Sequence, residues 1–194
     1  MSLRSRNTAG EAIPWNLGFT KINGVARDDK YFFMSVKILP IKIYPDKILR
    51  QRAAVVKKID KEIKRLILDM GKTMLVNEGV GLAAPQVGLS IRLIVVNTKD
   101  GPLALVNPKI TRKSWSKELG EEGCLSLPDF LANVKRHKKI NAIYWDKDGK
   151  KIKIKAEGLL ARVIQHEVDH LNGVLIIDYL KKKGLPARFR EQTP

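Results

Sequence analysis

Two histidines separated by three residues form the chemically most suggestive stretch of the chain, Gln165-His166-Glu167-Val168-Asp169-His170. On an α-helix, side chains four residues apart lie on one face, with their Cβ atoms about 5–6 Å apart. His166 and His170 can therefore offer two ring nitrogens to one metal ion, which is the H-E-x-x-H pattern. The carboxylate of Glu167 would lie near that ion and could take a proton from a water molecule bound to it. The stretch predicts a hydrolytic metal site.

The surrounding sequence favours a buried helix. Residues 158–164 lead into the histidine stretch without a break, and Gly173 is suited to end the helix. One apolar stripe consists of Leu160, Ile164, Val168 and Leu171, and Leu159 and Val163 lie on the side of the histidines. A helix that is apolar on two sides is expected to be buried. The alternative is that the histidines are ordinary core residues and Glu167 a solvated acid, but burying such groups without a function is costly.

A catalytic metal site of this kind needs a third protein ligand and an open position for water. His137 is a weak candidate, because it lies in the basic run 135–139, where positive neighbours oppose the binding of a cation. Cys124 is the chain's one cysteine and lies in the stretch 121–128, which has the composition of a loop. A cysteine thiolate is a strong ligand for iron(II), zinc, cobalt or nickel. The alternative for Cys124 is a small buried hydrophobic residue.

A second stretch, residues 79–88, has the sequence Gly-Val-Gly-Leu-Ala-Ala-Pro-Gln-Val-Gly. Closely spaced glycines alone are a weak signal and also occur in tight turns. The stretch is not a phosphate-binding loop, because it lacks the Gly-Lys-Ser/Thr sequence. Small residues followed by an amide suit a cleft in which an extended peptide lies against the backbone. Gln86 would there donate a hydrogen bond to a developing oxyanion.

The composition limits the class of protein. A chain of 194 residues with 44% hydrophobic residues can form one domain with its own core. The net charge of +17 predicts attraction to polyanions such as nucleic acid, the ribosome or an anionic membrane, although a solvated basic surface accounts for it equally well. No apolar run approaches the roughly 20 residues that a membrane span needs. A single cysteine excludes an internal disulfide and fits a reducing compartment.

Three segments are expected along the chain. Residues 1–34 have no sustained periodicity and read as an N-terminal extension, either a transit peptide or a leader added to the natural sequence. Residues 35–180 form the main domain, and residues 181–194 form a short basic C-terminal tail.

The main domain is predicted to be α+β. Apolar residues from Ile59 to Met74 recur at helical spacing, with Asp60 as N-cap, which predicts one long N-terminal helix. Strands are predicted at 91–96, 103–106, 109–112, 139–145 and 151–155, the last two joined by a hairpin turn at 146–149. Short strands linked by hairpins indicate mostly antiparallel sheets, packed around a central helix that carries the H-E-x-x-H stretch.

Together, three stretches resemble the motifs of peptide deformylases. They are residues 79–86, residues 122–126 and residues 165–170, in that order. A cysteine upstream of the histidine pair is not the order of ordinary zincin proteases, whose third ligand follows the helix. The resemblance covers about residues 36–180. The first 34 residues find no match in that family, and the tail after Leu180 is shorter than the C-terminal helix of many members.

The resemblance implies a mechanism. One divalent metal ion, iron(II) in life with zinc, nickel or cobalt as substitutes, would be held by Cys124, His166 and His170. Glu167 would activate water for attack on the formyl group of an N-formylmethionyl nascent peptide, releasing formate. Gln86 and the backbone N–H of Leu125 would stabilise the oxyanion. The substrate peptide would be bound by Gly79, Val80, Gly81, Leu125 and Val163. Glu122 is a candidate partner for Arg136 beside the site.

The resemblance also implies a setting. A deformylase would act in the bacterial cytoplasm, or in an organelle if residues 1–34 are a transit peptide, with transient contact to the ribosome. Two other classes stay open at this level: a metallopeptidase of another specificity, and an inactive deformylase-like protein that binds RNA or the ribosome.

Overall fold

The computed structural model describes residues 36–180 and residue 189. The predicted N-terminal extension lies outside the described residues, and so does the predicted basic tail apart from residue 189. Two α-helices are present in the described part, α2 (Lys61–Val76) and α3 (Gly158–His170). The strands are β1 (Gly81–Ala83), β2 (Leu93–Thr98), β3 (Gly101–Lys113), β4 (Lys117–Cys124), β5 (Leu127–His137), β6 (Lys139–Trp145) and β7 (Lys151–Glu157). Short 3₁₀-helices span Lys47–Arg50, Ala84–Val87 and Ile176–Tyr179.

The strands form two antiparallel sheets. Five strands pair in the order β1-β2-β3-β6-β7, and β4 pairs with β5 in a separate two-stranded ribbon. The one parallel pairing in the described residues is an isolated bridge between Ala54 and Ile91. The prediction of a mixed fold with mostly antiparallel sheets is therefore confirmed.

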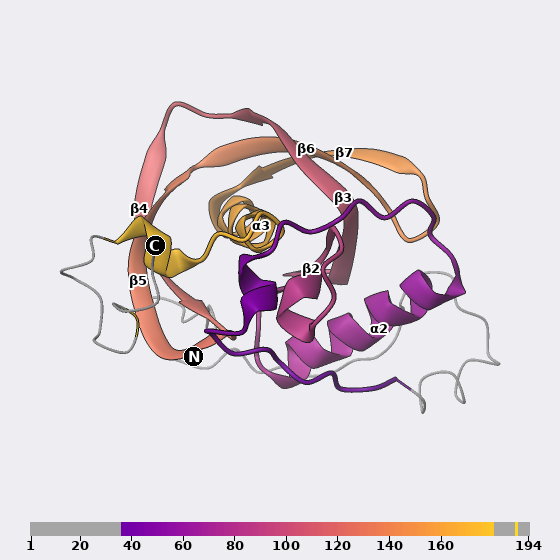
Figure 1. The fold of residues 1–194 in the computed structure, drawn as a ribbon. Helices are drawn as coiled ribbons and strands as arrows, with labels where there is room; N and C mark the ends of the chain where they lie inside the picture. Colours follow the sequence, from indigo (N-terminus) through magenta and orange to yellow (C-terminus); the bar gives the residue numbers. More distant parts are fainter. Residues whose placement is uncertain (1–35, 181–188, 190–194) are drawn as a thin grey trace.

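Strand β2 is buried on both faces. Its alternate residues belong to different apolar clusters, because successive side chains of a strand point to opposite faces. Leu93 and Val95 pack in the cluster that contains Met70 and Met74 of α2. Ile94 and Val96 pack with the α3 residues, Ile164 among them. The two α-helices therefore cover opposite faces of β2 (Figure 1).

Helix α2 follows the apolar periodicity of its sequence. Asp60 caps it by accepting a hydrogen bond from the backbone N–H of Ile63. Met70 and Met74 are fully buried core residues, as the sequence predicted. Among the described residues, no helix has the length and apolar character that crossing a membrane requires.

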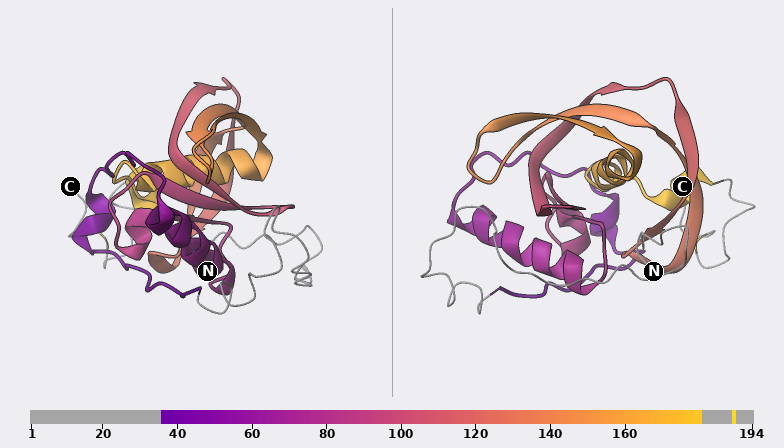
Figure 2. Two further views of the ribbon diagram at one scale, coloured as in Figure 1. Left: turned by 90° about the vertical axis from the view of Figure 1, so that its right-hand side faces the viewer. Right: turned by 180° about the vertical axis from the view of Figure 1, so that it is seen from behind.

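Helix α3 lies inside an arch of strands. Seen nearly along its axis, it is surrounded by β3 to β7 (Figure 1), and the view from behind shows the same arch (Figure 2). Ile164 and Leu171 are fully buried against the sheet. The arch brings the β4-β5 ribbon across the helix, and the polar side chains of α3 meet this ribbon.

The loop predicted at 121–128 is wrong for most of its length. Residues up to Cys124 belong to β4, and β5 begins at Leu127, so only Leu125 and Ser126 separate the two strands. The sequence Glu-Leu-Gly-Glu-Glu-Gly-Cys has low intrinsic strand propensity. Its pairing with β5 and the burial of Glu122 against arginines, which are tertiary contacts, override that preference.

Asn107 ties β3 to the segment that precedes α2. Its backbone has a left-handed φ of 53° beside a register shift in the β3-β6 pairing. Its side-chain oxygen accepts a hydrogen bond from the N–H of Val56, and its side-chain nitrogen donates one to the carbonyl of Val56, both at 2.9 Å.

We predict that Asn107→Ala lowers the free energy of unfolding by about 2–4 kcal/mol, from two lost hydrogen bonds and a strained left-handed alanine. Asn107→Gly removes the same bonds without the strain, so its loss should be smaller. Urea unfolding measures both. A change within about 0.5 kcal/mol for Asn107→Ala would show that the clamp contributes nothing.

Candidate metal centre

Three side-chain atoms that can bind a metal converge beside α3. Each of Cys124, His166 and His170 offers one ligand atom, and these atoms lie within 4.8 Å of one another. His170 Nε2 is 3.2 Å from His166 Nε2 and 3.3 Å from Cys124 Sγ. All three residues are buried. The residue that sequence reasoning disfavoured, His137, lies elsewhere, half-buried with its ring against the carbonyl of Ser114.

The histidines come from one element and the sulfur from another. His166 and His170 lie one turn apart near the C-terminal end of α3, and Cys124 is the last residue of β4. The arch of the β4-β5 ribbon across α3 is what brings the sulfur to the two rings.

Glu122 orients the first histidine. Its Oε2 lies 3.0 Å from His166 Nδ1, so that Nδ1 donates and the Nε2 lone pair faces the other two ligand atoms. Arg136 donates to both carboxylate oxygens at 2.9 Å, and Arg162 donates to Oε1 at 2.8 Å. Burial alone would raise the pKa of Glu122, but hydrogen bonds from His166 and Arg136 outweigh it and lower the pKa to about 2. The predicted pairing of Glu122 with Arg136 is present.

The cluster favours a positive charge between its three ligand atoms. Burial lowers the pKa of His170 well below its usual value, and a charge on His166 lowers it further. Burial also favours the neutral form of His166, but hydrogen bonds to Cys124 and Glu122 raise its pKa to about 10. Facing lone pairs at these separations repel unless a proton or a cation lies among them. A sulfur and two imidazole nitrogens fit a divalent transition-metal ion.

Glu167 is buried beside the cluster and is only partly satisfied. Its Oε2 forms no hydrogen bond to a described residue. Burial raises the pKa of Glu167 to about 7, and the charge of His166 opposes that rise. A carboxyl group with a pKa near neutrality can both accept and donate a proton.

Gly81 leaves the space that the Glu167 carboxylate occupies. A Cβ at position 81 would overlap Oε1 of Glu167 and would lie 2.8 Å from Cγ1 of Val163. Glycine is needed here for close approach, since β1 passes directly against α3. Gly79 is less crowded, with Cδ1 of Leu125 at 3.3 Å from such a Cβ.

Gln86 points its amide nitrogen at the site. Its side-chain oxygen accepts a hydrogen bond from the N–H of Ala83 at 2.9 Å, which fixes the orientation of the amide. Its Nε2 then lies 3.5 Å from Cys124 Sγ and 3.3 Å from Ser126 Oγ. Gln86 is buried. The first and second predicted motifs therefore meet at Cys124.

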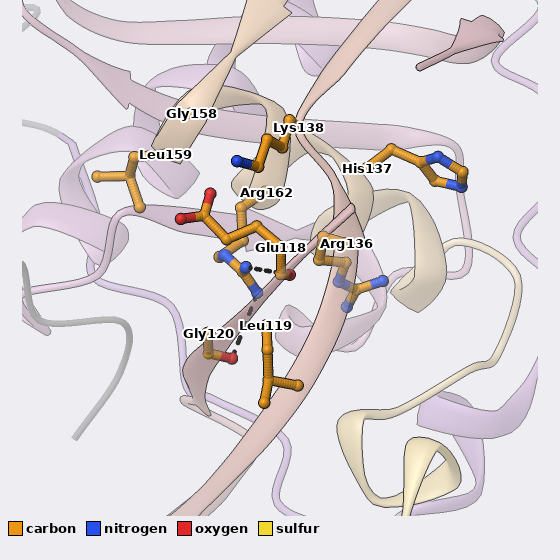
Figure 3. A pocket seen from close by; sticks show the side chains of 9 residues that line it. All are labelled: Glu118, Leu119, Gly120, Arg136, His137, Lys138, Gly158, Leu159 and Arg162. Atoms are coloured by element: carbon orange, nitrogen blue, oxygen red, sulfur yellow. Dashed lines mark hydrogen bonds between the residues drawn. The ribbon is translucent and has the colours of Figure 1, made fainter. Parts of the chain in front are cut away.

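Sequence reasoning missed Arg162. From the middle of α3 its guanidinium reaches the β4-β5 ribbon, donating to the carbonyls of Glu118, Gly120 and Val134 (Figure 3). A Cβ at position 120 would lie 2.7 Å from its Nη2, so Gly120 makes room for it. Beside it is a cavity of about 230 Å³ that is also lined by Leu159, which is half-exposed rather than buried as predicted. An arginine inside an otherwise apolar helical run was the available signal.

The chain matches known proteins over most of its length. Residues 38–185 match the family model described as polypeptide deformylase. A peptide deformylase from Rhizobium meliloti (strain 1021) is 49% identical over 150 residues, which cover 75% of this chain and 86% of that protein.

Solved structures give the same result. The crystal structure of peptide deformylase from Thermotoga maritima has a TM-score of 0.73 and 44% identity, covering 74% of this chain and 98% of that one. The peptide deformylase from Ehrlichia chaffeensis, in complex with actinonin, has a TM-score of 0.74 and 41% identity, covering 76% and 91%.

We predict that Cys124→Ala loses the ability to retain one tightly bound transition-metal ion, because two imidazoles alone form an incomplete site. Elemental analysis of the protein purified without oxygen measures the bound metal. His137→Ala serves as the control, since it removes a histidine away from the cluster and should keep full metal content. One tightly held ion per chain in Cys124→Ala would refute this ligand set.

Proposed function

The chain belongs to the polypeptide deformylase family, and we propose that residues 35–180 are its catalytic domain, with Glu167 as the base. It is a hydrolase that removes the formyl group from newly made polypeptides. The observation that carries the assignment of roles is the convergence of three ligand atoms next to a buried carboxylate oxygen without a partner.

Cys124, His166 and His170 would hold the metal, through the H-E-x-x-H stretch of α3 and the end of β4. When bound, the ion supplies a Lewis acid that makes a coordinated water more acidic and polarises the formyl carbonyl. We propose iron(II) as the physiological ion, with zinc, nickel or cobalt as substitutes, because sulfur and imidazole ligands suit all four.

Glu167 moves the proton. Its unpartnered Oε2 takes a proton from the attacking water as the oxygen bonds to the formyl carbon. The same carboxyl then gives the proton to the amine nitrogen as the carbon–nitrogen bond breaks, leaving formate and a free N-terminal methionine. The raised pKa of Glu167, about 7, suits both steps near neutral pH.

Gln86 and the backbone N–H of Leu125 are proposed to stabilise the negative charge on the formyl oxygen. Gln86 Nε2 is held by the fixed amide orientation, 3.5 Å from Cys124 Sγ. Leu125 directly follows Cys124 in the turn between β4 and β5. A preorganised donor of this kind typically contributes about 2.7–4 kcal/mol to transition-state stabilisation.

The edge of the five-stranded sheet is proposed to bind the peptide. β1 pairs with β2 on one side only, so its other edge is available for an added strand. Gly79, Val80 and Gly81 would supply that edge, and Leu125 and Val163 would contact the methionine side chain. Val163 and Glu167 both approach Gly81, which supports a substrate position between β1 and α3.

We place the reaction in the cytoplasm of a bacterium, with the ribosome as a transient partner that presents the nascent chain. Formate release from formyl-Met-Ala-Ser, with no cleavage of its peptide bonds, distinguishes this function from that of a metallopeptidase.

We predict that Glu167→Gln keeps its metal but lowers turnover of formyl-Met-Ala-Ser by about 10²- to 10⁴-fold, the usual contribution of a general base. Formate release and elemental analysis on the same sample measure both quantities. Glu157→Gln is the matched control, because Glu157 is exposed on the other side of α3's N-terminus and pairs only with Lys139. Wild-type turnover by Glu167→Gln would show that the assigned base is wrong.

Gly81→Ala tests the close approach of β1. The added methyl group has to displace the Glu167 carboxylate or Val163, so we expect turnover to fall by about 10²-fold, with metal retained. Gly71→Ala is the control, since its Cβ would meet Pro102 at an ordinary 3.5 Å. Unchanged turnover in Gly81→Ala would mean that Glu167 need not occupy this position.

A further inference from the structure

A large groove lies on the face of α3 that points away from the metal ligands. Its volume is about 940 Å³, and α3 contributes Gln165, Val168 and Asp169 to it. An α-helix turns about 100° per residue, so these positions lie opposite the face that carries His166, Glu167 and His170. The groove is therefore separate from the proposed deformylation site.

The groove is lined by positive charge. Its exposed and half-exposed cations are Arg52, Arg92, Lys109, Lys113, Lys117 and Lys135. Asp169 is the one carboxylate among the lining residues, and it is already engaged by Arg136 and by the hydroxyl of Tyr179. Almost all of the lining charge is thus available to a ligand.

Internal contacts do not neutralise these cations. None of the four lysines forms an ion pair with another residue of the described ranges 36–180 and 189. Arg92 is held by neutral oxygens, those of Leu171, Asn172 and Pro108. Burial and the nearby charge of Arg52 lower the pKa of Arg92. A polyanion in the groove would relieve this repulsion.

An aromatic side chain stands at the end of the groove. Trp115 lies in the turn between β3 and β4, between Lys113 and Lys117, and its relative exposure is 101%. A fully exposed tryptophan loses the benefit of burial, so its presence beside lysines points to a stacking partner. Single-stranded nucleic acid offers both groups that this arrangement suits, phosphates for the lysines and bases for the indole.

We propose that this groove, with Trp115 at its end, binds single-stranded RNA. The phosphodiester backbone lies along the lysines of β3, β4 and β5, and one base stacks on Trp115. The cations are spread over three strands and the segment at Arg52 rather than gathered at one point, which suits a polymer better than a single phosphate. A lipid surface is flat and cannot enter a groove between strands and a helix. The site extends the proposed contact with the ribosome but is independent of the reaction.

The experiment measures the affinity of the full chain for a fluorescently labelled single-stranded RNA of mixed sequence. In the groove variant, Lys109, Lys113, Lys117 and Lys135 are all changed to Gln. In the matched control, Lys150, Lys151, Lys153 and Lys155, which lie on and beside the edge strand β7 and outside the groove, are changed to Gln. Both variants lose four charges, and formate release at the wild-type rate shows that each is folded.

We expect the groove variant to bind at least about tenfold more weakly than the control variant, with a salt dependence that is lower by roughly 0.7 per lost phosphate contact. Trp115→Ala should weaken binding at least about fivefold through lost stacking. Equal affinity of the two lysine variants would overturn the proposal, because net charge alone would then explain binding. Tighter binding to anionic phosphatidylserine vesicles than to RNA, lost in Trp115→Ala, would overturn it in favour of a membrane contact.

Discussion

The buried carboxylate of Glu122 joins the parts of the molecule that make the site. It accepts hydrogen bonds from Arg136 on β5, from Arg162 on α3 and from His166, while it lies on β4 itself. A buried charge without such partners would cost several kcal/mol, and removing one partner of such a group typically costs about 3–5 kcal/mol. The β4-β5 ribbon can therefore cross α3 in only one register that keeps this carboxylate satisfied. That register places Cys124 beside the two histidines.

The rest of the fold supplies a rigid base for this contact. Strand β2 is covered on one face by α2 and on the other by α3, so α3 rests on a core that is apolar on both sides. β1 extends this sheet by one strand and passes so close to α3 that position 81 has no room for a side chain. The carboxylate of Glu167 is consequently confined between a sheet edge and the metal ligands, in a space that excludes bulk water. Low local polarity raises its pKa and strengthens each electrostatic interaction around it.

The two faces of α3 have different chemistry for the same structural reason. A helix enclosed by an arch of strands presents every face to some part of the protein, and each face acquires the character of the strands that it meets. The face toward β1 and the end of β4 meets glycines and the sulfur, and it holds the ligands. The opposite face meets the lysine-bearing parts of β3, β4 and β5, and it forms the floor of the basic groove. One helix thereby separates a small buried site from a large charged one.

The sequence by itself determined the local features: the amphipathic spacing of α2, the hairpin of β6 and β7, and the residue types able to bind a metal. These depend on neighbours three or four residues away, or on strict alternation. Only the tertiary structure decided that 117–124 is a strand, that Arg162 reaches Glu122 from inside an apolar run, and that position 120 needs glycine. Those outcomes arise because a buried charge takes partners from any distance along the chain, and such pairing leaves no periodic trace in the sequence.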